Sequence, residues 1–282
     1  MAATDVVVFG YRPGSQLGLL LQYKEFISSN NEQFSSWSLP GHFIYGSNDP
    51  SNEYGEGAET LDDTIARTLR MEVAGRNGKK IKIWEYDKNQ SFIEYLTPQT
   101  QVDRDPRGKR VITLPAMVFC KMEALSPLEE EYVRWVHLSR IDEDNRIEED
   151  NKSEWVSGKK DENYKLPFDH YTIYQEAIQR LRQIVRVQPV GKEILGDQFS
   201  LLDMQKLYEA ILDGSLDKPS FRKWALDKKR GLLEPLNVRD KDVSSRPAVS
   251  NRPALLYRFN EQTYNDLQVT KELNFDLKIR RK

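Results

Sequence analysis

Residues 59–72 read Glu-Thr-Leu-Asp-Asp-Thr-Ile-Ala-Arg-Thr-Leu-Arg-Met-Glu, and this stretch says more about the fold than any other. Two acidic residues near its start would fall in the first turn of a helix, where negative charge is favourable. Apolar residues recur every four positions, as a helix with one apolar face requires, at Leu61, Ile65, Leu69 and Val73. The pattern therefore predicts a helix from about Thr60 to about Val73.

Strand signals lie on both sides of this helix. Short apolar runs bounded by turn residues predict strands at residues 5–10, 17–23, 37–44, 81–86, 92–96, 111–122 and 133–137. A second amphipathic helix is predicted at residues 171–186. Strands and helices mixed in this way indicate an α+β domain.

The stretch also resembles the Nudix hydrolase box. That box places a glutamate, then an arginine–glutamate pair and then a pair of glutamates on a loop followed by a helix. Glu59 and Arg67 fall at its positions, and Trp37-Ser-Leu-Pro-Gly-His-Phe43 resembles the family's Trp-x-Leu-Pro-Gly-Gly-Phe segment. The resemblance implies a Nudix-like α/β/α sandwich with a mixed sheet.

The metal-binding positions of the box are not kept. Carboxylates at i, i+3 and i+4 share one helical face and can hold Mg²⁺ or Mn²⁺ against a diphosphate. Here those three positions carry Thr68, Met71 and Glu72. One helical carboxylate together with Glu59 is poor support for a metal ion, so we expect no metal site, no cofactor and no hydrolysis.

A second domain follows the break Val187-Gln-Pro-Val-Gly191. Ser200 can cap a helix that the turn at residues 213–215 stops, and Asp217 can cap another helix from Lys218 to about Lys229. A polar, basic loop then leads to a strand at residues 254–259. This order is that of a winged helix. We therefore divide the chain into a sensing domain, 1–187, and a winged-helix domain with a basic tail, 192–282.

The charge of the chain is unevenly distributed. The net charge is −2, but residues 191–282 contain 18 basic and 14 acidic residues. Within residues 218–258 the numbers are 11 and 4. Such an excess attracts polyanions if it lies on one face, and a solvated surface without function is the alternative.

Cysteine usage and hydropathy exclude several protein classes. The only cysteine, Cys120, lies in an apolar run, so neither a disulfide framework nor a cysteine-built metal site is expected. No basic leader with an apolar core opens the chain, and no stretch approaches the roughly 18 apolar residues of a membrane span. We expect a cytoplasmic protein without membrane contact.

Segments over nearly the whole chain resemble the NrtR-type Nudix-related transcriptional regulators. The sensing domain contains Gln101-Val-Asp-Arg-Asp-Pro-Arg-Gly108 and Pro167-Phe-Asp-His170, and the second domain contributes residues 199–205, 207–211, 216–223 and 252–257. Each segment alone is weak, but their order and spacing together are specific.

The resemblance implies a homodimeric repressor that binds a palindromic operator in double-stranded DNA through paired winged helices. An effector in the Nudix-like domain would change its affinity for DNA. Members respond to ADP-ribose or related nucleotides in NAD metabolism, and others respond to pentoses in sugar metabolism. The chain departs from the family in a long loop at residues 46–57 and an insertion at 142–163, so both effector classes stay open.

The candidate DNA-binding residues lie in and after the second helix of the motif. Ser220 and Arg222 are expected to read base edges, because arginine can donate two hydrogen bonds to guanine. Phosphate contacts are expected from Lys218, Lys223, Lys228, Lys229, Arg230, Arg246 and Arg252. Phe221 and Trp224 share the apolar stripe and are expected in the core.

The candidate effector-binding residues come from three segments. The resemblance places Arg104, Asp105 and Arg107 near the sensor pocket, although a solvated loop suits the residues equally well. His42, which replaces a glycine of the family, and the adjacent Phe43 are further candidates, with a surface position the alternative for His42. His170 is either a group at the start of a helix or a pocket residue.

Two other functional classes remain open. A Nudix hydrolase acting on ADP-ribose or a related nucleoside diphosphate would need carboxylates such as Glu56 or Glu59 together with Glu72. A protein-interaction module would use the winged helix against a protein partner, with the basic surface incidental.

Overall fold

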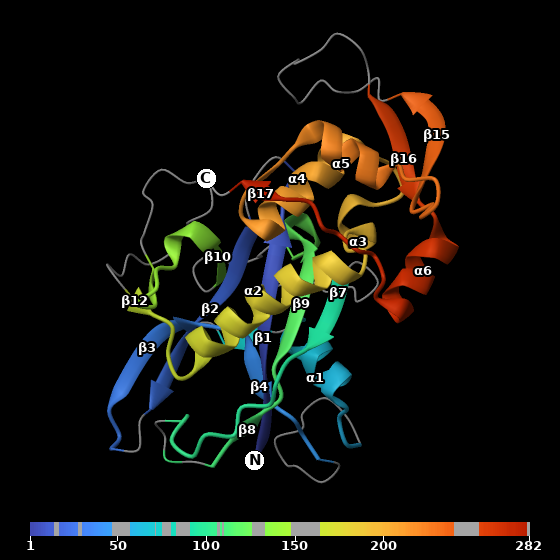
Figure 1. Ribbon diagram of the computed structural model, residues 1–282. Coiled ribbons are helices and arrows are strands. Elements are labelled where there is room, and N and C mark those ends of the chain that lie inside the picture. Colours follow the sequence, from blue (N-terminus) through green and yellow to red (C-terminus); the bar gives the residue numbers. More distant parts are fainter. Residues whose placement is uncertain are drawn as a thin grey trace. The chain divides into compact units, whose positions relative to one another are not determined.

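The computed structural model describes residues 1–13, 17–27, 30–46, 57–70, 72–74, 80–82, 91–105, 108, 110–125, 133–147, 164–239 and 254–280 (Figure 1). The chain forms two compact units. The N-terminal unit consists of residues 1–12 and 16–178, and the C-terminal unit consists mainly of residues 179–282. The division falls inside helix α2 (His170–Val187). The boundary placed at residues 187–192 from the sequence stays a prediction.

The N-terminal unit is built on a mixed sheet around strand β1 (Ala2–Tyr11). This strand pairs antiparallel with β2 (Leu17–Ile27) and parallel with β9 (Ala116–Lys121). The order β10-β2-β1-β9-β7 is completed by β10 (Val133–His137) and β7 (Ser91–Tyr95). Shorter strands extend it: β3 (Gln33–Ser38) pairs with β2, and β4 (Gly41–Phe43) and β8 (Ile112–Thr113) pair with β1. Two 3-10 turns, Met122–Leu125 and Leu138–Arg140, and the pair β11 (Arg146–Ile147) and β12 (Tyr164–Lys165) complete the unit.

Helix α1 (Leu61–Thr68) begins where the sequence predicts but ends earlier. Thr60 caps it, because its hydroxyl accepts the N–H of Asp63 and the Asp63 carboxylate accepts the N–H of Thr60. The predicted extension to residue 73 is wrong. Residues 72–74 instead form β5 (Glu72–Ala74), which pairs antiparallel with β6 (Lys80–Lys82). Strand pairing therefore outweighs the helical spacing beyond the first two turns.

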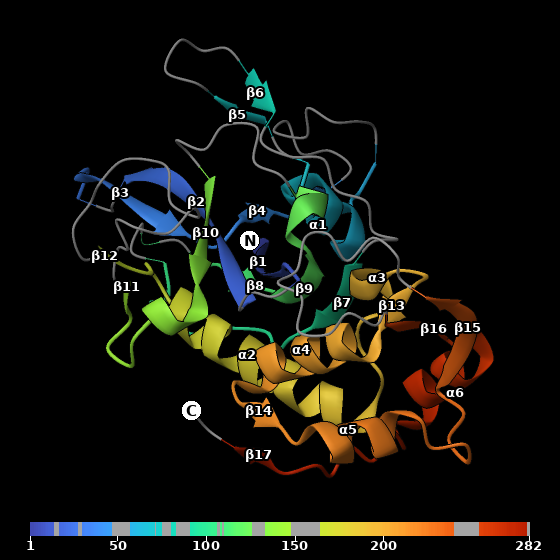
Figure 2. The same cartoon turned by 90° about the horizontal axis from the view of Figure 1, so that it is seen from above.

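The sheet is covered on both faces. Alternate residues of β1 point to opposite sides. On one side Val8 lies in an apolar core with Ile65 and Leu69, and on the other side the ring of Phe9 contacts Tyr174 of α2. The sheet therefore lies between α1 and the first half of α2 (Figure 2). These three layers agree with the predicted α/β/α sandwich and its mixed sheet.

The C-terminal unit combines helices with a small antiparallel sheet. Its helices after α2 are α3 (Lys192–Leu195), α4 (Leu201–Leu212), α5 (Lys218–Ala225) and α6 (Glu261–Thr270). The sheet has the order β13 (Phe199–Ser200), β16 (Leu255–Phe259), β15 (Leu233–Arg239), and β14 (Ser215–Leu216) pairs separately with β17 (Ile279–Arg280). Two helices followed by a β15–β16 pair match the order predicted for a winged helix. None of the helices in the described part of the chain is long and apolar enough to cross a membrane.

An aromatic cluster holds α4 and α5 together. Ser200 begins α4 with a second capping box, formed with Asp203. Tyr208 of α4 then packs against the rings of Phe221 and Trp224 in α5. Both α5 rings are buried, so their predicted place in the core is confirmed.

Residues 260–280 contain structure that the sequence did not predict. Asn260 caps α6. The chain beyond α6 returns to the core, where Leu273 and Phe275 are buried and their N–H groups donate to the carbonyls of Val187 and Arg186.

Candidate functional site

Glu59, the first glutamate of the Nudix-like box, is bound within the fold. Its carboxylate accepts hydrogen bonds from Nε and Nη2 of Arg67 at 2.6 and 2.9 Å and from the N–H of Tyr45 at 3.1 Å. Nη2 of Arg67 also donates to the carbonyl of Phe43 at 2.8 Å. Burial raises the pKa of Glu59, but the hydrogen bonds from Arg67 and Tyr45 outweigh this effect and lower the pKa. The ion pair thus joins the segment before α1 and strand β4 to the helix.

The positions for metal-binding carboxylates do not share one helical face. Thr68 ends α1 and is buried, and Met71 lies outside the described residues. The assignment of Glu72 to the helix is wrong, because Glu72 begins β5. Among the residues that the structure describes, no group of three His, Cys, Asp or Glu side chains could hold a metal ion.

A cavity of about 340 Å³ opens in the N-terminal unit. Five of the six effector-binding candidates line it: His42, Phe43, Arg104, Asp105 and His170. The sixth, Arg107, lies outside the described residues. The lining residues that were not selected from the sequence include Lys24, Glu25, Phe26 and Phe168. Phe168 is part of the motif that ends at His170 and could have been found from it.

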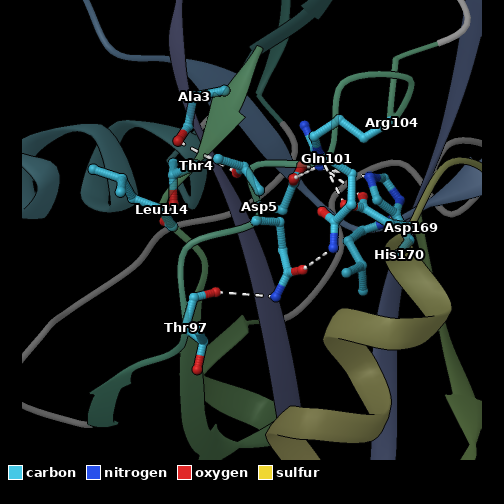
Figure 3. A network of polar contacts seen from close by, with 12 residues as sticks. Ala3, Thr4, Asp5, Thr97, Gln101, Arg104, Leu114, Asp169 and His170 are labelled. Carbon is cyan, nitrogen blue, oxygen red and sulfur yellow. Dashed lines mark hydrogen bonds and ion pairs between the residues drawn. The ribbon is translucent and has the colours of Figure 1, made fainter.

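Arg104 lies between two carboxylates at the wall of this cavity (Figure 3). Nη2 donates to Oδ2 of Asp5 at 2.8 Å and to Oδ1 of Asp169 at 2.7 Å, and Nε donates to Oδ2 of Asp169 at 2.8 Å. The two-point contact with Asp169 uses the planar shape of the guanidinium. Burial lowers the pKa of Arg104, but Asp169 and Asp5 raise it, so the side chain stays charged.

His170 also contacts Asp5 at this wall of the cavity. Its Nδ1 accepts the N–H of Leu39 at 3.2 Å, so Nε2 carries the proton and points to Oδ1 of Asp5 at 3.4 Å. Burial raises the pKa of Asp5, but His170 and Arg104 together hold it well below its usual value of 3.8. Asp5 is therefore an ionised group that positions both neighbours.

The lining of the cavity also includes a lysine and a neutral histidine. Burial and the positive charges of Lys24 and Arg67 lower the pKa of His42 to about 3. Nζ of Lys24 donates to the carbonyl of Gly41 at 2.8 Å. Gly41 has no room for a side chain, because a Cβ there would lie 2.6 Å from Oδ1 of Asp5. The cavity thus offers an ammonium group, an imidazole and aromatic rings to a small molecule.

Helix α5 has one buried and one basic face. Asp217 caps the helix by accepting the N–H of Ser220 at 3.0 Å. Every predicted nucleic-acid contact on this helix is exposed: Lys218, Ser220, Arg222 and Lys223. Lys228 and Lys229 are exposed in the turn that follows. The arrangement gathers five basic side chains in and just after one short helix.

Arg230 is placed differently from its basic neighbours. Its Nη1 donates to the carbonyl of Trp224 at 2.6 Å, and the guanidinium lies 5.0 Å from the centre of the Trp224 ring. Its Nη2 is 3.9 Å from the carboxylate of Asp227. Arg230 therefore packs within the unit, and its phosphate contact stays a prediction. Arg246 and Arg252 lie outside the described residues.

Comparison with known proteins gives one family match and one similar curated protein. Residues 191–259 match the NrtR DNA-binding winged helix domain. The chain is also similar to the ADPR responsive transcriptional repressor NtrR of Acinetobacter baylyi, with 26% identity over 265 residues, which cover 94% of this chain and 84% of the relative.

Solved structures share the fold of nearly the whole chain. NrtR of Shewanella oneidensis, alone and complexed with a 27mer DNA, gives TM-scores of 0.61 and 0.59 at 22% and 23% identity, covering 94% of this chain and 96% and 95% of those chains. A MutT/nudix family protein from Enterococcus faecalis gives a TM-score of 0.57 at 20% identity, covering 92% of this chain and 85% of that chain. The predicted fold class is confirmed: a Nudix-like domain is followed by a winged helix.

Proposed function

We propose that this protein, an NrtR-type Nudix-related protein by its fold and its winged-helix domain, is a ligand-responsive transcriptional repressor. The observation that carries the proposal is the basic, exposed face of α5 within residues that match a DNA-binding winged helix. The relative from Acinetobacter is named as a repressor, and one similar structure was solved with DNA. The hydrolase and protein-interaction alternatives gain no comparable support.

We propose that α5 enters the major groove of duplex DNA. On its exposed face Ser220 and Arg222 would read base edges, since arginine matches the two acceptors of guanine. The lysines would bind phosphate as point charges: Lys218, Lys223, Lys228 and Lys229. Arg246 and Arg252 remain proposed wing contacts on the sequence alone.

The cavity of the N-terminal unit is the proposed effector site, and a nucleotide of the ADP-ribose kind is the proposed effector. Its volume of about 340 Å³ lies in the range of small-molecule sites. Lys24 can bind a phosphate, Glu25 and Asp105 can accept hydrogen bonds from ribose hydroxyls, and the rings of Phe26 and Phe168 can contact a base. His42, Phe43, Arg104 and His170 would complete the contacts. A pentose has neither a phosphate nor a base, so it would gain less from the charge of the lysine and from the rings.

Calorimetry on three proteins tests this assignment. Wild type, Lys24→Met and the exposed control Lys165→Met are titrated with ADP-ribose and with L-arabinose. We expect Lys24→Met alone to weaken ADP-ribose binding by at least tenfold, since a charged hydrogen bond contributes about 1.5–3 kcal/mol. If arabinose binds tightly and Lys24→Met does not weaken its binding, the proposed effector is a pentose and not a nucleotide.

We propose further that the Nudix-like domain does not hydrolyse its ligand. Two observations support this: the carboxylate of Glu59 is engaged by Arg67, and Glu72 belongs to strand β5 and not to helix α1.

Binding as a homodimer to a palindromic operator is the remaining part of the proposal. Paired recognition helices would contact half-sites about one helical turn apart. Selection of binding sequences from a randomised duplex library tests it directly. We expect enriched palindromes and a dimer by light scattering, with binding weakened by the effector. A monomer that enriches no sequence would refute the proposal.

A further inference from the structure

The end of the described chain lies beside the start of the proposed recognition helix. Strand β17 pairs antiparallel with β14, with Ser215 opposite Arg280 and Leu216 opposite Ile279. Helix α5 begins two residues after Leu216. Figure 2 shows β14 and β17 together near α5. Two segments far apart in the sequence thus form one surface at the N-terminal end of α5.

The chain before β17 is anchored in the core of the unit. The ring of Phe275 lies 4.6 Å from that of Trp224 and 5.2 Å from that of Tyr208, measured between centroids. Phe275 and Leu273 are buried and hydrogen-bonded through their backbones. The position of β17 is therefore set by packing against α4 and α5.

Gly214 makes the close approach of β17 possible. A Cβ at Gly214 would clash with Cγ2 of Ile279 and would lie 2.8 Å from the carbonyl oxygen of Arg280. Ile279 therefore points at Gly214. Because successive side chains of an extended chain point in opposite directions, Lys278 and Arg280 point away from this contact. Both are exposed.

The charge of Arg280 acts on the first turn of α5. The pKa of Asp217, the cap of that helix, is lowered first by the hydrogen bonds from Ser220, and the positive charge of Arg280 adds to this effect. Arg280 thus lies near the start of α5, which agrees with its place opposite Ser215. Residues 278–282 contain four basic side chains: Lys278, Arg280, Arg281 and Lys282.

We propose that Lys278 and Arg280 form an additional phosphate-binding site for duplex DNA, next to the segment that α5 would read. The inference rests on the proposed DNA binding by α5 and extends it beyond residues 191–259, which match the DNA-binding domain. Residues preceding a recognition helix lie near the backbone at the edge of the major groove, where lysine and arginine bind phosphate oxygens without reading bases.

Salt-dependent DNA binding of the full chain tests this site. Wild type is compared with Lys278→Gln/Arg280→Gln and with the charge-matched control Lys192→Gln/Lys271→Gln, on a selected sequence and on a random duplex. Each lost phosphate contact removes about 0.9 from the slope of log K against log salt. We expect the double variant to lose about 1.8 from the slope and to bind both duplexes roughly 10- to 30-fold more weakly at about 0.15 M salt. The control should match wild type.

A second variant tests the position of the strand instead of its charges. Gly214→Val keeps Lys278 and Arg280 but forces β17 away from β14. We expect it to lose a similar part of the affinity, while circular dichroism stays that of a folded protein. Wild type that binds no duplex would refute the proposed function itself. If wild type binds DNA and both the Lys278→Gln/Arg280→Gln variant and Gly214→Val bind equally well, this inference alone is wrong. A loss of affinity for the selected sequence but not for the random duplex would also overturn it.

Discussion

Replacing Arg104 by methionine removes the cation between Asp5 and Asp169 but keeps an apolar stem of similar length. The variant loses three charge-assisted hydrogen bonds of 2.7–2.8 Å and leaves two carboxylates around a side chain that is only 7% exposed. Removing one partner of a buried ion pair costs about 3–5 kcal/mol. We expect the free energy of unfolding of the N-terminal unit to fall by about this amount.

A matched control is available on the surface of the same unit. Arg12 is 3.1 Å from the carboxylate of Glu123, and the two side chains are 47% and 54% exposed. Such pairs contribute about 0–1 kcal/mol. Urea unfolding followed by hydrogen exchange of peptides from β1 and β9 reports on the N-terminal unit by itself. If Arg104→Met loses no more stability than Arg12→Met, our account of the cavity wall is wrong.

The pH dependence gives a second readout of the same variant. The pKa of Asp5 is lowered in the folded state, so its stabilisation is complete above its usual value of 3.8 and is lost as the pH falls below it. Without Arg104 the folded-state pKa of Asp5 rises. Ionised Asp5 then stabilises the variant less than the wild type, and the variant loses less stability in acid. The stability difference between wild type and Arg104→Met should therefore shrink below about pH 4. A constant difference would exclude Asp5 as the responsible group.

Three further predictions concern function. With Mg²⁺ or Mn²⁺, formation of AMP and ribose 5-phosphate from ADP-ribose should stay at background, and turnover that Glu72→Gln abolishes would contradict a non-hydrolytic domain. Arg222→Ala should cost about 1–3 kcal/mol at a selected DNA site and relax base preference there, whereas Lys228→Ala should weaken all duplexes alike and reduce the salt slope by about one. Identical behaviour of the two variants would refute the division between base and phosphate contacts. Because the pKa of His42 is about 3, wild type and His42→Gln should show the same pH dependence of effector binding by calorimetry between about pH 5 and 8, and a difference would mean that the imidazole titrates there.

Helix starts were predictable because their signals are local. The pairs Thr60 with Asp63 and Ser200 with Asp203 are capping boxes within four residues of sequence. The end of α1 was not predictable, because it depends on pairing between β5 and β6, and apolar spacing carries no information about that partner. Tertiary pairing overrode a local periodicity there.

The cavity was predictable only where a motif marks it. His42, Arg104 and His170 lie in segments that resemble family motifs, and all three line the cavity. Lys24 and Phe26 lie on β2. In a strand, a lysine is usually a surface residue and a phenylalanine usually a packing residue, so neither marks a cavity. Only the pairing of distant strands brings them to the same space. The segment after α6 was missed although residues 273–279 alternate apolar and polar side chains, a spacing typical of an extended chain with one buried face.

The ion pair between Glu59 and Arg67 has a consequence for how such sequences are searched and mutated. Because the pair joins β4 and the preceding segment to α1, natural selection for a folded domain is enough to retain both residues. A motif search that scores Glu59 and Arg67 therefore detects an ion pair that stabilises the fold, whether or not the domain binds a metal ion. In saturation mutagenesis, loss of function at Glu59 therefore does not by itself identify a catalytic group, because every substitution there also removes the ion pair with Arg67.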